Sequence, residues 1–303
     1  MNGLGLGIDA GGTRTRWALA QGEIILAEGE VAGLSALQLS SEAGRASIQT
    51  TLAELAQAVL AHGQPARVVA GLTGFGDDGE LLKAWLSSRL QLPHAALTLY
   101  NDIHIAYLAH FAPGEGYLVY AGTGSIGAFI DSEQQFHRAG GRGVVLDDGG
   151  GGFWIAREAL RHIWRNEDEA PGRWRASPMA HAVFEQIGGD DWALSRQFIY
   201  GQERGAVGRL ALAVAASAER DPVAAAILCA AGEELARLAL ALTARFGERP
   251  IVLSGRAASL HPLLAQAMRK RLPDALSLTQ HQRQAHHAAA RIAARTEPNA
   301  DCP

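Results

Sequence analysis

Residues 7–15 of the chain have the sequence Gly-Ile-Asp-Ala-Gly-Gly-Thr-Arg-Thr. An apolar run leads into this segment, so Asp9 is expected near the end of a buried strand that a tight turn follows. A carboxylate there can hold a hydrated Mg²⁺, while glycines let backbone amides approach a phosphate and threonines offer hydroxyl groups. The alternative is a glycine-rich hairpin in which Asp9 only starts the turn. The residues expected to contact a phosphate are Gly11, Gly12, Thr13 and Thr15.

The segments around this turn predict a mixed sheet with helices packed against it. Short apolar runs separated by glycine form a strand meander, and strands then alternate with helices of amphipathic spacing. We expect strands at residues 4–9, 15–20, 23–28, 67–73 and 96–100, and helices at 42–61, 78–90 and 103–111.

A second strand meander begins about 110 residues after the first. It predicts a second, related α/β lobe, and a small-molecule site is expected in a cleft between two such lobes. We expect strands at residues 116–121, 125–131, 135–139 and 250–254, several helices between 153 and 246 with breaks near Pro171, Pro178 and Pro222, and helices at 262–272 and 284–295.

Composition excludes several classes of protein. The chain has 303 residues, 48% of them hydrophobic, and 27 basic against 31 acidic residues give a net charge of −4. Such a chain can bury the cores of two domains, and without clustered basic residues nucleic acid is not an expected partner. No apolar run approaches the roughly 18 residues of a membrane span, and no signal peptide is apparent, so a cytoplasmic protein without a membrane partner is expected.

Cysteine and histidine give little sign of a metal centre. The two cysteines, Cys229 and Cys302, are far apart, which excludes a cysteine-rich zinc or iron–sulfur site supplied by this chain alone. The histidines show no His-Glu-x-x-His arrangement. His281, His286 and His287 are therefore expected on a solvated helix face, where a metal site is improbable.

A second glycine loop follows residues 116–121. Residues 122–127, Gly-Thr-Gly-Ser-Ile-Gly, match a dinucleotide-binding fingerprint, but that fingerprint needs a helix after it. Here residues 128–130 continue as a strand, so we expect a strand–turn–strand phosphate loop and not an NAD site. A Walker loop is excluded as well, because Lys83 and Lys270, the only lysines, lie in predicted helices.

Three further segments carry polar groups that chemistry could use. Asp102 follows a predicted strand, where it could accept a proton from a substrate hydroxyl or simply cap the next helix. The glycine-rich residues 140–152 contain Asp147 and Asp148, which could bind the hydroxyls of a polyol or belong to a flexible connection. Residues 253–258, Leu-Ser-Gly-Arg-Ala-Ala, could pack against a base or ribose, or be an ordinary turn.

In this order the segments resemble the superfamily of actin, heat-shock ATPases and sugar kinases. Residues 101–102, 121–125 and 140–154 more narrowly resemble the BadF/BadG/BcrA/BcrD ATPase family, especially its N-acetylglucosamine kinases, and the similarity runs from about residue 5 to 294. The resemblance implies an α/β fold of two ribonuclease-H-like (actin-like ATPase) lobes with an interlobe cleft that binds ATP, Mg²⁺ and a sugar. It places residues 1–115 and 284–303 in the N-terminal lobe and residues 116–283 in a C-terminal lobe with a helical insertion. A homodimer is expected on the same ground.

The resemblance also implies roles for individual residues. Asp102 is the expected base for the 6-hydroxyl of an amino sugar, most simply N-acetylglucosamine or glucosamine, and Asp9 the carboxylate that holds Mg²⁺ through water. ATP is expected at the first phosphate loop and at Gly122, Thr123, Gly124, Gly255, Arg256 and Ala257. The sugar is expected at Ser125, Ile126, Gly141, Gly143 and Asp148, besides Asp102.

Departures from the family pattern put the sugar's identity in doubt. Gly149 stands where relatives have a second acid, Ala36 where they place a sugar-binding asparagine, and Arg256 where a second glycine is usual. An ATPase activator of the BadF type remains an alternative, although residues 116–120 lack the cysteine that would bridge an iron–sulfur cluster. A non-catalytic sugar sensor is the other alternative, and retention of both Asp9 and Asp102 opposes it. A zinc-containing sugar kinase is excluded by the missing cysteine cluster.

Overall fold

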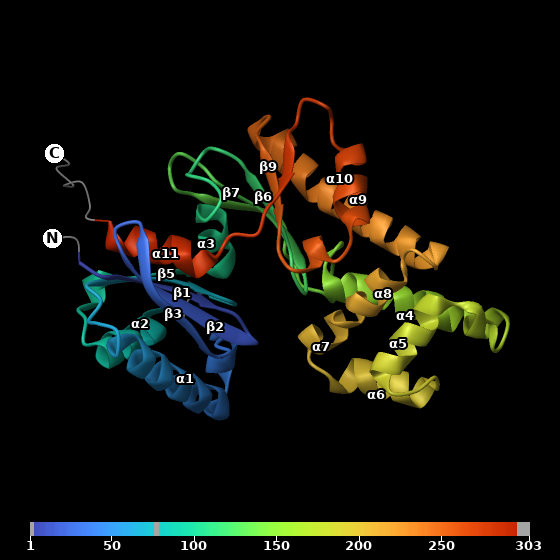
Figure 1. The fold of residues 1–303 in the computed structure, drawn as a ribbon, viewed down its shortest axis with the longest axis horizontal. Helices are drawn as coiled ribbons and strands as arrows, with labels where there is room; N and C mark the ends of the chain where they lie inside the picture. Colours follow the sequence, from blue (N-terminus) through green and yellow to red (C-terminus); the bar gives the residue numbers. More distant parts are fainter. Residues whose placement is uncertain (1–2, 76–78, 296–303) are drawn as a thin grey trace. The chain divides into compact units, whose positions relative to one another are not determined.

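A computed structural model describes residues 3–75 and 79–295. The chain divides into two compact units, Met1–Ala112 with Arg283–Pro303, and Pro113–Gln282. Each unit is built on a five-stranded mixed sheet (Figure 1). Two predicted features, the start of a helix at Asp78 and the chain end from residue 296 that contains Cys302, lie outside the described residues.

The sheet of the first unit has the strand order β3-β2-β1-β4-β5. The first three strands are antiparallel, and β4 and β5 run parallel to β1. The carboxyl ends of β1, β4 and β5 therefore meet at one edge of the sheet, where polar residues that follow the strands gather. The strands are β1 (Gly5–Ala10), β2 (Arg14–Gln21), β3 (Ile24–Ala32), β4 (Arg67–Leu72) and β5 (Leu97–Asn101).

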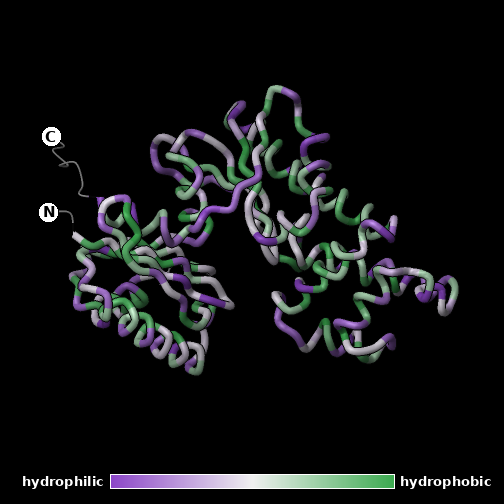
Figure 2. Tube along the Cα trace, viewed as in Figure 1, coloured by the Kyte–Doolittle hydropathy of each residue, from purple (hydrophilic) through white to green (hydrophobic). Residues whose placement is uncertain are grey.

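Helices cover both faces of this sheet. One face packs against α1, in which hydrophobic and hydrophilic residues alternate (Figure 2), and against α2; Leu6 and Ile8 belong to the core that they share. The other face packs against α3 and the C-terminal helix α11. The helical elements are η1 (Ala36–Ser40), α1 (Glu42–Leu60), α2 (Gly79–Leu90), η2 (His94–Ala96), α3 (Asp102–Leu108) and α11 (Ala285–Ala294).

The alternation of glycine with large apolar residues in β1 follows from these two faces. Leu6 and Ile8 point to the α1 side, and Gly5 and Gly7 point to α11. A Cβ atom on Gly7 would lie 2.1 Å from the carbonyl oxygen of His286, so only glycine permits this close approach of α11. The first residues of α11 are thereby held directly over the sheet.

The sheet of the second unit has the order β10-β9-β6-β7-β8. Its first three strands in the chain are antiparallel, and β9 is parallel to both β6 and β10. The sequence did not predict β10, a short edge strand with only half-buried and exposed residues and hence little hydrophobic pattern. The strands are β6 (Tyr117–Ala121), β7 (Ser125–Ile130), β8 (Phe136–Gly140), β9 (Ile251–Ser254) and β10 (Leu278–Gln280).

The helices of the second unit form two groups. The long α9 packs on β6, β7 and β8 and against α10, and α4 to α8 together with η3 form an insertion between β8 and α9. Two of the predicted breaks are helix starts, since Pro178 and Pro222 occupy the first turns of α5 and α9. The elements are α4 (Gly152–Glu169), η3 (Arg173–Ala176), α5 (Pro178–Ile187), α6 (Trp192–Gly201), α7 (Arg204–Gly208), α8 (Leu210–Ser217), α9 (Pro222–Phe246), η4 (Ala257–Ser259) and α10 (Pro262–Arg271). No helix in the described part of the chain is long and apolar enough to cross a bilayer.

Candidate active site

Three polar residues gather at the carboxyl edge of the first sheet. In the parallel register Ala10 pairs with Leu72, and Leu72 with Asn101. Asp9 consequently lies one residue before the end of β1, while Thr73 and Asp102 come directly after β4 and β5. The backbone amide of Thr73 donates to the carbonyl oxygen of Ala10 at 3.0 Å, which fixes the ends of β1 and β4 against each other.

Asp102 is not the N-cap of α3, which was one of the two roles that the sequence allowed for it. The N-cap of α3 is Asn101, whose side-chain oxygen accepts a hydrogen bond from the amide of His104 at 2.7 Å. Asp102 is the first residue of the helix. Its Oδ1 accepts from the Ile103 amide at 2.9 Å and its Oδ2 from the Thr73 hydroxyl at 2.6 Å. The carboxylate is therefore held by two donors on two elements and remains partly exposed.

Asp9 is the most perturbed acid at this edge. Burial, and secondarily the negative charge of Asp102, raise the pKa of Asp9 to about 6, although the guanidinium of Arg16 opposes the shift. A carboxylate whose ionisation is opposed by burial and by a neighbouring negative charge favours a bound cation. The residues present therefore fit a Mg²⁺ ion, with Asp9 as the group that would hold it.

The turn after β1 leaves open space at Gly12. The amide of Gly11 is used, since it donates to the carbonyl oxygen of Arg14 at 3.0 Å. No described atom lies within 4 Å of a Cβ built on Gly12, and Thr13 is exposed. Gly12 and Thr13 can therefore meet a phosphate.

Thr15 departs from the expectation that it contacts a phosphate. Its side chain is fully buried on β2, on the core side with Ala10, and its hydroxyl has no partner among the described residues. The alternation of the strand turns this residue inward, and a buried hydroxyl cannot reach a ligand at the turn. Thr15 is therefore not expected to contact the phosphate.

The second glycine loop is joined to the start of a helix. Gly122 and Thr123 accept hydrogen bonds through their carbonyl oxygens from the amides of Gly152 and Phe153, both at 2.9 Å. A Cβ on Gly151 would lie 2.6 Å from the backbone of Gly124, so the chain segments touch. The loop is thus a strand–turn–strand structure, as predicted, and the first residues of α4 (Gly152–Glu169) are hydrogen-bonded to it.

The turn after β9 lies beside this loop. Because β6 and β9 are parallel, with Tyr120 opposite Ser254, their carboxyl ends are adjacent. Gly255 has φ +99°, and a Cβ there would lie 2.3 Å from the carbonyl oxygen of Ala121, so glycine is required on both grounds. Ala257 is buried beside it, whereas Arg256 is exposed.

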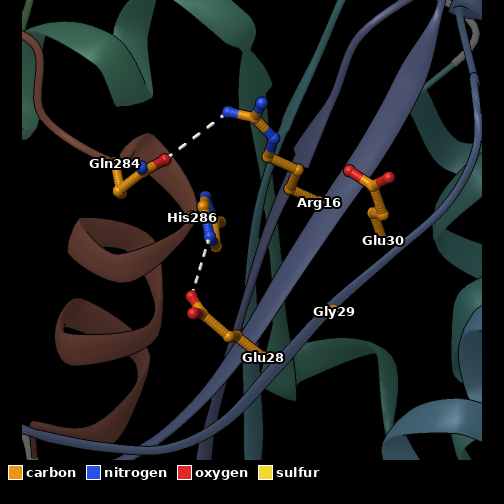
Figure 3. Close-up of a pocket in the computed structure, with 6 residues that line it drawn as sticks. All are labelled: Arg16, Glu28, Gly29, Glu30, Gln284 and His286. Atoms are coloured by element: carbon orange, nitrogen blue, oxygen red, sulfur yellow. Dashed lines mark hydrogen bonds and ion pairs between the residues drawn. The ribbon is translucent and has the colours of Figure 1, made fainter.

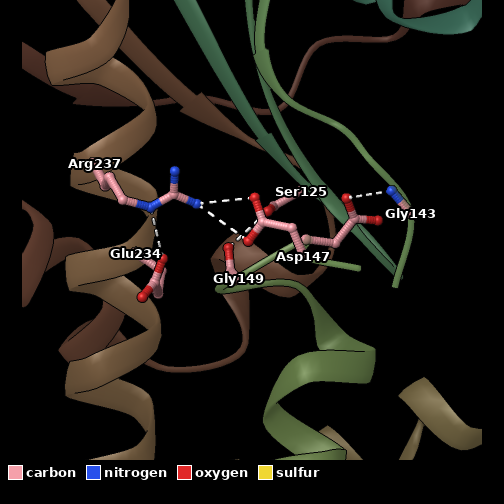
Figure 4. Close-up of polar contacts among 7 residues, drawn as sticks. Ser125, Gly143, Asp147, Gly149, Glu234 and Arg237 are labelled. Carbon is pink, nitrogen blue, oxygen red and sulfur yellow. Dashed lines mark hydrogen bonds and ion pairs between the residues drawn. The ribbon is translucent and has the colours of Figure 1, made fainter. Parts of the chain in front are cut away.

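The glycine-rich segment before α4 is ordered by its acids (Figure 4). Asp148 is buried, adopts φ +53°, and accepts a hydrogen bond at Oδ1 from the amide of Gly143 at 3.0 Å. Burial raises the pKa of Asp148. Asp147 instead forms an ion pair with Arg237 on α9 at 3.2 Å. The two neighbouring acids therefore have different surroundings, and Asp148 is the one turned into the loop.

The hydroxyl of Ser125 is already engaged. It donates to the carbonyl oxygen of Gly149 at 2.6 Å and is buried (Figure 4). Toward a sugar this hydroxyl could act only as an acceptor. Ile126 and Gly141 touch each other, since a Cβ on Gly141 would lie 2.6 Å from the Ile126 side chain, and a Cβ on Gly143 would meet no described atom within 4 Å.

A sequence profile places the chain in a family. The profile of the BadF/BadG/BcrA/BcrD ATPase family matches residues 6–290, nearly the whole chain. The chain belongs to the BadF/BadG/BcrA/BcrD ATPase family. Membership of this ATPase family implies the use of ATP. No curated protein matches the sequence significantly.

Solved structures resemble this chain along its length. A candidate N-acetylglucosamine kinase from Chromobacterium violaceum is 28% identical, with 97% of this chain and 99% of that one covered and a TM-score of 0.73. A candidate N-acetylglucosamine kinase from Porphyromonas gingivalis is 18% identical, with 95% and 98% covered and a TM-score of 0.73. A ROK family glucokinase from Streptomyces griseus, crystallised with glucose and AMPPNP, is 18% identical, with 96% and 98% covered and a TM-score of 0.60. The last two likenesses show the fold alone, and the predicted fold class of two α/β, actin-like ATPase lobes is confirmed.

The sequence analysis missed two features of this chain. Thr73 had no assigned role, although a hydroxyl at the end of the strand beside that of Asp102 was a usable signal. The expectation of a solvated face for the C-terminal histidines is wrong for His286, which is 4% exposed. His281 is exposed but precedes α11, and His287 is half-buried. The close packing of α11 on β1, which no local pattern reveals, buries His286.

Proposed function

We propose that the chain is an ATP-dependent sugar kinase that phosphorylates the 6-hydroxyl of an amino sugar, most simply N-acetylglucosamine or glucosamine. The observation that carries this proposal is the placement of Asp102. Its carboxylate lies at the end of a strand, does not serve as the N-cap of α3, and is held by Thr73, while the acid Asp9 lies at the end of β1, two strands away in the same sheet. The 28% identity to a candidate N-acetylglucosamine kinase supports the same reaction class.

In the proposed reaction Asp102 is the general base. The oxygen of the sugar hydroxyl forms a bond to the γ-phosphorus of ATP, the bond from that phosphorus to the bridging oxygen breaks, and ADP leaves. The hydroxyl proton passes to the carboxylate of Asp102. The hydrogen bonds from Thr73 and the Ile103 amide keep this carboxylate in one rotamer, so it need not reorganise as the proton arrives.

The nucleotide would be bound by backbone and hydroxyl groups of the glycine turns. A bound Mg²⁺, held through Asp9, would neutralise charge on the phosphates. The exposed backbone of Gly12 and the exposed Thr13 hydroxyl suit phosphate oxygens, and Gly255, which packs closely on β6, suits a flat base. The residues assigned to ATP are Gly11, Gly12, Thr13, Gly122, Thr123, Gly124, Gly255, Arg256 and Ala257.

Recognition of the sugar is assigned to the glycine-rich segment and to the start of β7. Asp148 is buried and ordered in the loop, and a carboxylate suits paired hydroxyls. Ser125, Ile126, Gly141 and Gly143 complete the assignment. Specificity that rests on hydrogen bonds falls sharply when one partner is missing. Ala36 and Gly149 stand where relatives have a sugar-binding asparagine and a second acid, so the identity of the sugar depends on which groups take over those hydrogen bonds. The homodimer and the cytoplasmic location stay predictions.

Release of ADP from MgATP, measured with a panel of sugars and without sugar, tests this proposal. The panel contains glucose, glucosamine, N-acetylglucosamine, N-acetylmannosamine and N-acetylmuramic acid. We expect release that depends on one amino sugar. Release at the same rate without sugar would favour the ATPase activator, and ATP binding without any release would favour the sensor; either result contradicts the kinase.

Replacement of Thr73 by valine tests its positioning role. Loss of one hydrogen bond to a charged group is worth ~1.5 kcal/mol, so kcat should fall about tenfold while KM for ATP changes little. Thr73→Ser retains the hydroxyl and should restore most of the activity. Thr98→Val, at an exposed position on β5, is the control and should leave kcat unchanged. Equal loss in the valine and serine variants would show that Thr73 acts by packing instead.

A further inference from the structure

A cluster of Glu28, His286 and His287 joins two distant parts of the sequence in the first unit. Glu28 is on β3, and the histidines are the second and third residues of α11. The Nε2 atom of His286 lies 3.6 Å from Oε2 of Glu28, and Nε2 of His287 is hydrogen-bonded to the same oxygen. One ligand atom from each residue lies within 4.8 Å of the other two. Three donors thus converge on one small volume.

A pocket opens beside this cluster (Figure 3). It has a volume of about 260 Å³ and is lined by Arg16, Glu28, Gly29, Glu30, Gln284 and His286. The exposed fractions of the ligand side chains are 5% for His286, 23% for His287 and 58% for Glu28. The cluster therefore has a rigid buried side and an open side from which an ion and its water can enter.

We propose that Glu28, His286 and His287 form a binding site for a divalent transition-metal ion such as Zn²⁺. Two imidazoles and one carboxylate are a common protein ligand set for zinc, and the pocket leaves room for water as the fourth ligand. Ion binding would require ligand atoms now up to 4.8 Å apart to close around one centre, a shift within reach of the half-exposed His287 and the exposed Glu28. No step of the proposed phosphoryl transfer uses this cluster.

The protonation states of His286 and Glu28 suit a metal. Burial lowers the pKa of His286 to about 4, so its ring is neutral at pH 7 and can offer a lone pair. The hydrogen bond from His287 lowers the pKa of Glu28, which is therefore a carboxylate. Metal ions bind the deprotonated forms of both kinds of ligand.

Two nearby features limit the affinity. The guanidinium of Arg16, which lies 3.5 Å from the side-chain oxygen of Gln284, places a positive charge by the pocket (Figure 3). The histidines also occupy the first turn of α11, where the helix dipole disfavours a cation. We expect micromolar and not nanomolar binding. Such an ion would fasten α11 to the edge strand β3.

Titration calorimetry of the whole chain with ZnCl₂ at pH 7.5, without nucleotide, tests the site. We expect one equivalent to bind, and Glu28→Gln and His287→Gln each to weaken it by more than about tenfold. These two residues are chosen because they are more exposed than His286 and their variants should fold. His94→Gln, at an exposed histidine in the same unit, and Asp9→Asn should bind as the unchanged protein does.

Two further readouts separate a metal site from a hydrogen-bonded tether. Zn²⁺ should raise the Tm of the unchanged protein and of His94→Gln but not of Glu28→Gln. Substitution with Co²⁺ should give visible absorption bands of a nitrogen-ligated ion that both cluster variants lose. Equal Zn²⁺ affinity in all variants, or no binding at 100-fold above the micromolar range, would overturn the proposal and leave Glu28 as an ordinary ion-pair partner of the histidines.

Discussion

Asp102→Asn is expected to lower kcat for sugar phosphorylation by about 10²–10⁴-fold, the usual contribution of a general base. Asparagine has nearly the same shape: its oxygen can accept from the Ile103 amide, and its amide nitrogen can donate to the Thr73 hydroxyl. It cannot accept the proton of the sugar hydroxyl. The loss should therefore appear in kcat, whereas ATP binding measured by calorimetry should change less than about threefold.

Controls make this result specific to Asp102. Asp274→Asn replaces an exposed aspartate in the other unit and should leave kcat unchanged. The circular dichroism spectrum and the Tm of Asp102→Asn should match those of the unchanged protein. A folded Asp102→Asn variant with kcat within about threefold of normal would contradict its assignment as the base.

Asp9→Asn is expected to abolish turnover and, at the same time, to stabilise the chain. The pKa of Asp9 is about 6 in the folded chain, against 3.8 for an ordinary aspartate. Folding therefore takes up a proton between about pH 4 and pH 6. The stabilisation that this brings is complete below about pH 4 and is lost as the pH rises through about 6. Asparagine keeps the neutral form at every pH.

The stability difference between the two proteins should consequently depend on pH. Below about pH 4 the free energies of unfolding should agree, and above about pH 6 Asp9→Asn should be more stable by roughly 2–3 kcal/mol. Denaturant unfolding at pH 4 and pH 7.5 measures this. Mg²⁺ should raise the Tm of the unchanged protein and not that of Asp9→Asn. A variant that is less stable at pH 7.5, or that retains turnover, would contradict the role given to Asp9.

The sequence predicted the elements with strong patterns and the turns that connect them. Glycine turns such as Gly11-Gly12 and periodic apolar residues such as those of α1 are local signals, and the strands and helices they predict are present. β10 was not predicted, because a three-residue edge strand has almost no hydrophobic pattern. Its pairing with β9 depends on chain neighbours far away in the sequence.

The surroundings of individual side chains were harder to predict from the sequence than the strands and helices. Neighbouring side chains of a strand point to opposite faces of the sheet. A shift of one residue in the pairing of β2 would therefore decide whether Thr15 faces the turn or the core. Whether Asp102 caps α3 depended on where the helix starts, and the helix starts one residue earlier than predicted, with Asn101 as its cap. The burial of His286 depends on tertiary contact with Gly7, across nearly the whole chain.

The phosphorus-31 NMR spectrum of the chain with MgATP and the amino sugar that stimulates ADP release tests the central claim most directly. The account predicts a phosphomonoester signal that grows in step with ADP and is split by two protons, as a phosphate on the sugar's C6 methylene requires. A signal split by one proton would place the phosphate on another hydroxyl. Inorganic phosphate as the sole product beside ADP would contradict the claim that this family member is a sugar kinase.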